Sequence, residues 1–230
     1  MEIWIGSLLE GARQATGAVA VIDVFRAFTT AAVVLANGAS RIVMVSTPEE
    51  AFALRNAGIG QVCMGEVRGR PPDGFDFGNS PLEVAKVDFH GKTVIQRTSA
   101  GTQGIAAASH ADRLYAASLV TASATARALA AEGSGRIALV AMGNNGTART
   151  DEDELCALHL RNLLEGRSGN PDAVRQLILA GGEIARFNDP ARPYLQPGDV
   201  GIALDIDRYD FAIRVLAEDG HAVARTERIT

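Results

Sequence analysis

An acidic and a basic side chain stand together directly after an apolar run near the start of the chain. The run AVAVIDV, residues 18–24, carries Asp23, and Arg26 follows three positions later. An ionised aspartate can ligate Mg²⁺, and an arginine can bind an anion through two parallel hydrogen bonds. The same pair also suits a helix N-terminus that attracts an acid, with a surface arginine beside it, so the fragment alone leaves both interpretations open.

A long polar loop, GEVRGRPPDGFDFGNSP over residues 65–81, contains the next group of chemically capable side chains. Loops of this length in compact domains are usually functional. Glu66 and Asp76 are candidate metal ligands or bases, and Asn79 and Ser80 could present amide, hydroxyl and backbone N–H groups to an anion. An ordinary Gly- and Pro-rich turn, with Ser80 as a helix cap, is the structural alternative.

Hydroxyl side chains and glycines gather in a third segment, RTSAGTQG at residues 97–104, which contains Thr98, Ser99, Gly101 and Thr102. Glycine lets backbone N–H groups approach an anion closely, and a helix N-terminus favours negative charge. The segment is therefore a candidate anion cradle. Neither GxxxxGK[ST] nor GxGxxG is present in it, and a generic hydroxyl-rich turn stays open as the alternative.

Four consecutive acids occupy residues 151–154, after the polar segment GNNGTART. Thr150 and Asp153 fit a capping box loosely, and acids in a first helical turn are stabilised by the helix dipole. Adjacent acids also repel one another, and a divalent cation would relieve that repulsion. Both a helix start and a cation site remain open here.

Strands and helices alternate through the first 142 residues, which would bring these groups to one edge of a sheet. We expect strands at 18–24, 41–45, 61–64, 93–97, 113–117 and 136–142, with helices at 26–37, 48–56, 104–109 and 121–132. This alternation predicts a three-layer α/β/α fold with a mostly parallel sheet. Ligands in such folds bind at the carboxyl ends of the strands, where the polar groups lie.

The last third of the chain follows a different pattern. Helices are expected at 151–164 and 171–180, followed by a Pro-containing stretch at 188–198. Two runs at 211–216 and 221–228 flank Glu218-Asp219-Gly220, which indicates a hairpin turn. We therefore expect an antiparallel edge pair of strands near the C-terminus. With no linker or repeat visible, the prediction is a single domain over residues 1–230.

Composition narrows the choice of partners. The net charge is −5 and no Lys/Arg cluster with interleaved aromatics is present, which argues against nucleic-acid binding. The apolar runs are shorter than the roughly 18 residues that a membrane span needs, and no signal peptide is visible, so we expect a cytoplasmic protein without a membrane partner. Cys63 and Cys156 lack zinc-site or disulfide spacing. A small molecule is the expected partner, and homo-oligomer formation is left open.

Taken in order, IDVFRA, GE, GFDFGNSPLE, TSAGTQG and EDELCA make the sequence resemble the 2-phosphosulfolactate phosphatase family over residues 19–160. GFDFGNSPLE is the most specific of these elements. The resemblance implies an enzyme of coenzyme M biosynthesis, with Mg²⁺ as cofactor and a small anionic phosphorylated substrate. The implied reaction is hydrolysis of (R)-2-phospho-3-sulfolactate, or a closely related 2-phospho acid, to sulfolactate and phosphate.

Roles for individual residues follow from matching these motifs position by position. The resemblance implies catalytic roles for Asp23, Arg26 and Asp76, with Asp76 as a base toward water. It implies Mg²⁺ ligation by Asp23, Glu66, Glu152 and Asp153. Combined with the anion cradle, it predicts that the substrate is bound by Asn79, Ser80, Arg97, Thr98, Ser99, Gly101 and Thr102.

The third motif departs from the family pattern. Relatives of the founding type read TTTNGT where this chain reads RTSAGT, so Arg97 replaces a threonine and Ala100 replaces an asparagine. Arg97 would bind a second anionic group of the substrate if it faces the crevice. The register of its strand, and therefore the face on which Arg97 lies, stays open.

Three other functions compete with this interpretation. A haloacid-dehalogenase type of phosphatase, which forms an aspartyl phosphate, needs a second acid two positions after Asp23, where this chain has Phe25. A non-catalytic anion-binding or regulatory protein would keep the pocket without turnover. A nucleotide-binding oxidoreductase would need the glycine fingerprint that the sequence lacks.

Overall fold

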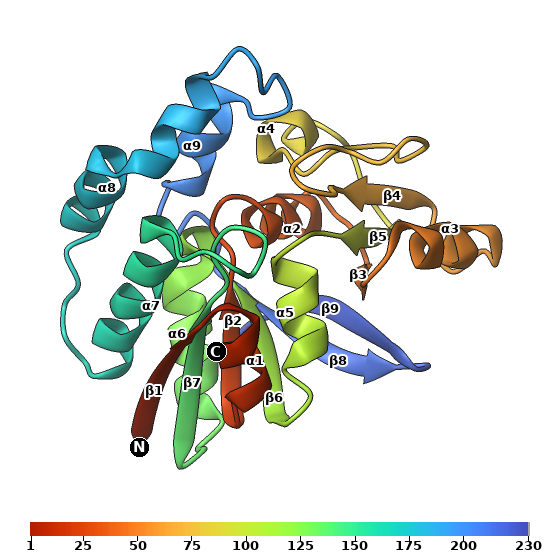
Figure 1. Ribbon diagram of the computed structural model, residues 1–230. Helices are drawn as coiled ribbons and strands as arrows, with labels where there is room; N and C mark the ends of the chain where they lie inside the picture. Colours follow the sequence, from red (N-terminus) through yellow and green to blue (C-terminus); the bar gives the residue numbers. More distant parts are fainter. Residues whose placement is uncertain (230) are drawn as a thin grey trace.

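The computed structural model describes residues 1–229, in which nine strands form one sheet in the order β1-β7-β2-β6-β8-β9-β3-β5-β4 (Figure 1). The strands are β1 (Glu2–Ser7), β2 (Gly17–Ile22), β3 (Arg41–Val45), β4 (Val62–Gly65), β5 (Thr93–Arg97), β6 (Ala111–Ala117), β7 (Arg136–Ala141), β8 (Ala212–Glu218) and β9 (His221–Glu227). The α-helices are α1 (Leu8–Gln14), α2 (Ala27–Ala36), α3 (Pro48–Asn56), α4 (Pro81–Val84), α5 (Gly101–Ala107), α6 (Ala122–Ala131), α7 (Asp151–Leu164), α8 (Pro171–Ala180) and α9 (Pro197–Ala203). Two 3₁₀ segments, η1 (Leu119–Thr121) and η2 (Gly182–Asn188), complete the elements.

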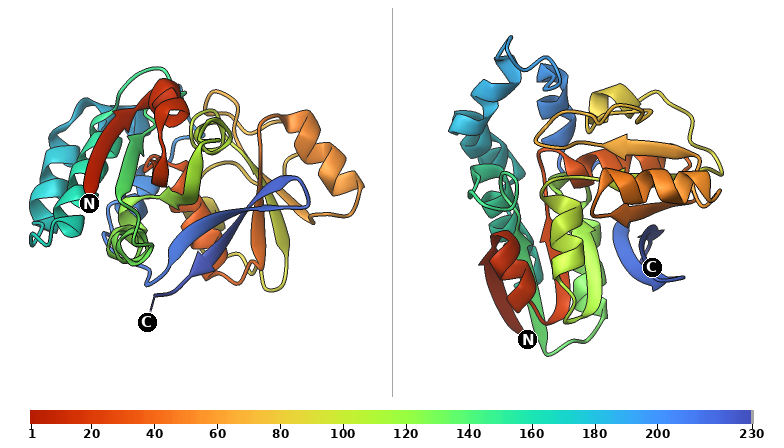
Figure 2. Two further views of the ribbon diagram at one scale, coloured as in Figure 1. Left: turned by 90° about the horizontal axis from the view of Figure 1, so that it is seen from below. Right: turned by 45° about the vertical axis from the view of Figure 1, so that its right-hand side comes forward.

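Strand β2 explains why the parallel strands are unbroken apolar runs. All six of its residues are buried, because β6 and β7 pair along its two edges and helices cover both of its faces. Val19 and Val21 pack in a core with α1, α2 and α5, whereas Ala18, Ala20 and Ile22 pack in a second core with α6 and α7. The view from below in Figure 2 separates these helices into layers on the two sides of the sheet.

The hairpin of β8 and β9 lies in the middle of the sheet. Asp219 and Gly220 both have positive φ, as a tight two-residue hairpin turn requires, so the hairpin prediction is confirmed. The prediction of an edge position is wrong, because β8 pairs antiparallel with β6 and β9 pairs antiparallel with β3. A turn signal defines a hairpin locally, whereas its place in a sheet depends on distant strands that the local signal does not contain.

This central ribbon joins two groups of parallel strands. One group is β1, β7, β2 and β6, and the other is β3, β5 and β4. Figure 1 shows the two groups turned across each other, as expected when strand twist accumulates over a large sheet. The loops that follow β2, β4, β5 and β7 consequently reach the same region of the molecule.

The three-layer α/β class, the mostly parallel sheet and the antiparallel strands near the C-terminus are confirmed. Strands β3 and β5 and helices α3, α7 and α8 begin and end at the predicted residues. Strand β1 and helix α1 were not predicted, and α5 begins at Gly101, three residues before the expected start. The single-domain organisation stays a prediction.

Two smaller expectations concern the helices and the thiols. Over residues 1–229, every helix is too short or too polar to cross a lipid bilayer. Cys63 and Cys156 are both free and buried. Burial raises the pKa of both thiols, so they act as packed side chains.

Candidate active site

A pocket of about 310 Å³ lies where the strand ends of the two parallel groups meet. Its lining is strongly polar and includes four arginines and two carboxylates. The loop after each of four strands contributes to it: Asp23, Phe25 and Arg26 after β2, Glu66, Arg68, Gly69 and Asn79 after β4, Ser99 and Ala100 after β5, and Gly143, Asn144 and Asn145 after β7. The remaining lining residues come from the segment between α8 and α9: Arg186, Arg192, Tyr194 and Leu195.

Asp23 is a buried carboxylate of the pocket wall whose pKa is raised. It is buried one residue beyond β2, and its Oδ1 accepts a hydrogen bond of 3.0 Å from the N–H of Ala27. The pKa of Asp23 is raised to about 6, mainly because the carboxyl is buried and in smaller part because of the negative charge of Glu66. The two carboxylates are therefore close enough to repel each other, which is the situation that a bound cation relieves.

Glu66 is held rigidly by the neighbouring loops. Its Oε1 accepts from the N–H of Ser99 at 2.5 Å, and its Oε2 accepts from the N–H of Gly69 at 2.5 Å and from the Ser99 hydroxyl at 3.0 Å. These bonds tie the loop after β4 to the loop after β5. A carboxylate has about four lone-pair positions, so Glu66 retains capacity for one further partner in the pocket.

Asp153 joins two loops from behind the pocket. Its Oδ1 accepts from the N–H of Val24 at 2.7 Å, and its Oδ2 accepts from the N–H of Gly143 at 2.8 Å. Burial raises the pKa of Asp153, with the nearby charges of Glu152 and Asp23 adding to the effect. The capping-box interpretation of Thr150 is wrong, because this residue is the N-cap of α7 but makes no side-chain cap hydrogen bond.

Glu152 is buried next to this group but does not line the pocket. Its Oε1 lies 3.8 Å from the Arg186 guanidinium, and its Oε2 has no hydrogen-bond partner within residues 1–229. Burial raises the pKa of Glu152 to about 7. Arg186 also pairs with Glu183 at 3.0 Å and does line the pocket, so it connects this buried acid to the pocket surface.

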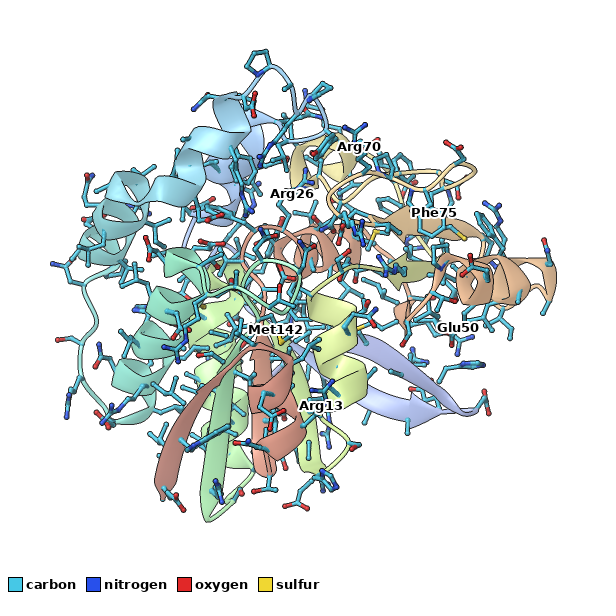
Figure 3. The ribbon with its side chains drawn as sticks, viewed as in Figure 1. Arg13, Arg26, Glu50, Arg70, Phe75 and Met142 are labelled. Carbon is cyan, nitrogen blue, oxygen red and sulfur yellow. The ribbon has the colours of Figure 1, made fainter. Side chains whose placement is uncertain are left out.

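The pocket brings together some of the residues singled out in the sequence. Asp23, Arg26, Glu66, Asn79 and Ser99 all line it. Asn79 Oδ1 is buried and has no partner within the described residues, so it is available to a ligand. Arg26 lies on the side of the molecule where Arg70 is also found (Figure 3). Both contact Tyr194: the Arg26 guanidinium donates to the Tyr194 carbonyl, and the Arg70 guanidinium lies over the Tyr194 ring.

Other predicted residues support the pocket from outside. Ser80 is buried and caps α4, accepting from the N–H of Glu83, which confirms the structural alternative for this residue. Thr98 and Thr102 hydrogen-bond to each other's backbone and hydroxyl groups across the turn that begins α5. Gly101 begins that helix, and an added Cβ there would come within 3.0 Å of Asp23 Oδ2. The turn thus packs closely against Asp23.

Asp76 and Arg97 do not line the pocket. Asp76 closes the outer edge of β4: its Oδ2 accepts from the N–H of Cys63 at 2.8 Å and lies 3.4 Å from Arg55. The Arg97 guanidinium donates to the carbonyls of Ser46 and Glu66 and to the Ser99 hydroxyl. These contacts give Asp76 a strand-edge role and give Arg97 a role in bracing the loop that carries Glu66.

Sequence reasoning missed the wall formed by Arg186, Arg192 and Tyr194. These residues lie between α8 and α9, in a segment of 3₁₀ helix and Pro-containing turns without strand or motif signals. Arg192 is about half exposed and pairs with Asp189 at 3.2 Å. Among the basic residues of the sequence, Lys86 and Lys92 are the lysines and the rest are arginines. Such a surplus of arginine suits anion binding but does not indicate which arginines take part.

The donor set fits a magnesium site of limited size. Within residues 1–229, no group of three or more His, Cys, Asp or Glu side chains is arranged to hold a metal. Mg²⁺ is usually held by one or two carboxylates together with water and substrate phosphate. Asp23 and Glu66 meet that requirement from the pocket wall, whereas Glu152 and Asp153 lie behind it.

The α/β fold places a polar pocket with four arginines at the strand ends, which is where ligands bind in folds of this class. The family described as 2-phosphosulpholactate phosphatase matches residues 6–188. This chain therefore belongs to the 2-phosphosulfolactate phosphatase family, a family of phosphoric monoester hydrolases. The resemblance drawn from the motifs is confirmed.

Individual relatives carry the same name, "Probable 2-phosphosulfolactate phosphatase". The protein of Thermotoga petrophila is 37% identical over 150 residues, which are 65% of this chain and 64% of that protein. The protein of Bacillus subtilis is 32% identical over 213 residues, or 91% of this chain and 90% of that protein. The protein of Carboxydothermus hydrogenoformans is 45% identical over 109 residues, 47% of this chain and 45% of that protein. The match thus spans just under two thirds of the Thermotoga relative and most of the Bacillus one.

Proposed function

We propose that this chain is a Mg²⁺-dependent phosphomonoesterase that hydrolyses 2-phosphosulfolactate or a closely related 2-phospho acid to the free hydroxy acid and phosphate. The observation that carries the proposal is the pocket at the strand ends, which Asp23 and Glu66 line together with four arginines. Family membership supports the reaction class, and the relatives' printed name supports the substrate.

The charge of the pocket suits this substrate class. A substrate with phosphate, carboxylate and sulfonate groups brings about four negative charges, and burying them without partners would be prohibitive. The lining has four arginines, of which three pair with acids of the chain: Arg26 with Asp199, Arg186 with Glu183 and Arg192 with Asp189. Arg68 has no ion pair within residues 1–229, so its charge is available to an incoming anion.

The chain's own residues divide the work as follows. Asp23 and Glu66 would hold Mg²⁺, which when bound supplies Lewis-acid stabilisation of the phosphate oxygens and a more acidic water. The arginines orient the substrate and offset the charge on its equatorial oxygens. Asn79 Oδ1, which has no hydrogen-bond partner among residues 1–229, can accept from a donor on the substrate or from a bound water. Asp76 takes no part, because it lies outside the pocket.

Phosphate release from 2-phosphosulfolactate tests the proposal. We expect release with Mg²⁺, loss of release after exhaustive EDTA treatment and recovery when Mg²⁺ is added back. Undiminished release after EDTA treatment would contradict the metal requirement. Stabilisation of the fold by the substrate, without any release, would identify a non-catalytic anion-binding protein instead.

A further inference from the structure

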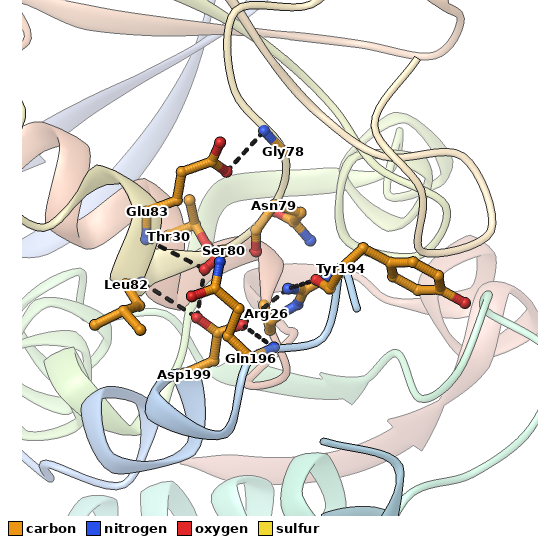
Figure 4. A network of polar contacts seen from close by, with 10 residues as sticks. All are labelled: Arg26, Thr30, Gly78, Asn79, Ser80, Leu82, Glu83, Tyr194, Gln196 and Asp199. Carbon is orange, nitrogen blue, oxygen red and sulfur yellow. Dashed lines mark hydrogen bonds and ion pairs between the residues drawn. The ribbon is translucent and has the colours of Figure 1, made fainter. Parts of the chain in front are cut away.

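Arg26 is almost completely buried, yet part of its guanidinium reaches the pocket. The side chain is 3% exposed, and its Nη1 donates to Asp199 Oδ2 and to the carbonyl of Tyr194, each at 2.8 Å (Figure 4). A guanidinium has five donor hydrogens. Within residues 1–229, all of its hydrogen bonds use Nη1, so the Nε and Nη2 edge remains for an anion in the pocket.

Asp199 is fully buried in the first turn of α9, and its acceptor sites face several segments of the chain. Besides Arg26, it accepts from the Ser80 hydroxyl at 2.5 Å and from the N–H of Leu82 at 3.2 Å. A buried carboxylate needs such partners, because an unpaired one would be strongly unfavourable. The single carboxylate thus fixes Arg26 to the loop that carries GFDFGNSP.

The same network also fixes the wall that the motifs did not reveal. The Tyr194 carbonyl accepts from the same Nη1 of Arg26 that donates to Asp199. The N–H of Gln196 lies 3.4 Å from Asp199 Oδ2 (Figure 4). Tyr194 lines the pocket. Asp199 lies beyond residues 6–188, where the family match ends, and none of the sequence motifs included it.

We propose that Asp199 is a positioning residue for the reaction, which holds the Arg26 guanidinium with its free edge toward the substrate phosphate. The inference rests on the proposed function. Asp199 does not touch the substrate, and its charge offsets that of Arg26. Its contribution is therefore to orient the Arg26 guanidinium, so that the remaining N–H groups of Arg26 point toward the substrate phosphate. The effect of removing its charge must therefore depend on the presence of Arg26.

A double-mutant cycle tests this dependence. We expect Asp199→Asn to lower kcat/KM about a hundredfold in the wild-type background and less than about threefold further in the Arg26→Met background. Asp205→Asn is the matched control, because Asp205 pairs with Arg208 on the surface just after α9 and does not line the pocket. That control should keep wild-type kinetics. Equal losses from Asp199→Asn in both backgrounds would overturn the proposal.

Affinity for inorganic phosphate provides a readout that does not need turnover. Calorimetric titration in the presence of Mg²⁺ should show about tenfold weaker phosphate binding for Asp199→Asn than for wild type, and no further weakening in the Arg26→Met background. If the wild type binds phosphate but releases none from 2-phosphosulfolactate, the proposed function fails while the positioning role is still decided by this titration. Unchanged phosphate affinity in Asp199→Asn would contradict the positioning role.

A second variant covers the case in which Asp199→Asn does not fold. Asp199→Glu keeps the charge but displaces it by one methylene, so we expect a folded protein whose kcat/KM is at least about tenfold lower. Wild-type kinetics in Asp199→Glu would overturn the proposal, since the position of the carboxylate would then be unimportant. Failure of both variants to fold would also count against it, by making Asp199 a residue of the fold.

Discussion

The two walls of the pocket are built in different ways. The strand-end wall, defined by Asp23, Glu66 and Ser99, consists of side chains that backbone N–H groups or neighbouring loops hold in place. The C-terminal wall, defined by Arg186, Arg192 and Tyr194, is held by ion pairs and by the Arg26–Asp199 network. Both carboxylates of the pocket lining belong to the first wall, whereas the second wall has arginines and no carboxylate of the lining; the loops after β2 and β4 add Arg26 and Arg68.

This difference suits two separate roles for the walls, one in the reaction and one in substrate recognition. Carboxylates fixed by backbone groups keep a constant geometry, which suits a cation and the phosphoryl group. Arginines on a segment of 3₁₀ helix and turns can change between relatives without disturbing the sheet, which suits recognition of the rest of the substrate. Substitutions in the first wall should therefore affect turnover, and substitutions in the second should affect substrate preference.

The largest effect is expected at Asp23. Asp23→Asn removes a charged group from the strand-end wall while nearly preserving its shape, so kcat should fall at least about a hundredfold. Because burial raises the pKa of Asp23 to about 6, the neutral amide should leave the melting temperature unchanged or higher. Phosphate release and thermal unfolding measure the two effects.

Asp76→Asn is the matched control for Asp23→Asn, since it removes an acid from the GFDFGNSP motif outside the pocket. It should reduce kcat less than about tenfold. A loss as large as that of Asp23→Asn would restore the role of Asp76 as a base. Unfolding of the Asp23→Asn variant would show that Asp23 serves the fold.

A smaller and more selective effect is expected at Arg192. Arg192→Met should raise KM for 2-phosphosulfolactate about tenfold and leave a simple aryl phosphate nearly unaffected, because a half-exposed arginine contributes modestly to binding. Arg97→Met should instead affect both substrates equally, since Arg97 braces the Glu66 loop. Steady-state kinetics on the two substrates separate these patterns, and a selective effect at Arg97 would reverse the assignment of the walls.

The smallest effect concerns Glu152, behind both walls. Its folded-state pKa of about 7 lies above the ordinary 4.5, so the folded protein binds this proton more tightly than the unfolded chain. Between pH 4.5 and about pH 7, the free energy of unfolding should therefore fall as pH rises, by up to about 1.4 kcal/mol per pH unit. Glu152→Gln should reduce this slope and be the more stable form at pH 8. Denaturant titrations at pH 5 and pH 8 measure it, and an unchanged slope would show that Glu152 does not titrate in this range.

Much of the fold could be predicted because its signals are local. The buried strand β2 is a continuous apolar run, and α3 begins at Thr47-Pro48, where the threonine caps the helix. Strand β1 could not be predicted, because its six residues, EIWIGS, are of mixed polarity and resemble an irregular segment. The central position of β8 and β9 could not be predicted, because it depends on pairing with strands about 100 and 180 residues away.

The site residues, like the strands, could be predicted where the signal is local and could not where it depends on distant contacts. Asp23 and Glu66 follow strands directly and Ser99 stands two residues after β5, so the rule that ligands bind at strand ends located them. The position of Asp76 depended on whether its loop returns along β4, and the orientation of Arg97 depended on the register of β5. Asp199 could not be found from sequence, since its importance comes from the burial of Arg26 about 170 residues earlier.

A crystal structure of the chain with Mg²⁺ and sulfolactate, the unreactive product, tests the central claim most directly. The account predicts Mg²⁺ on Asp23 and Glu66, and sulfolactate in the same pocket with an anionic group within hydrogen-bond distance of Arg192. Sulfolactate bound elsewhere, or Mg²⁺ held by Asp76 or by Glu152 and Asp153 away from the pocket, would contradict it.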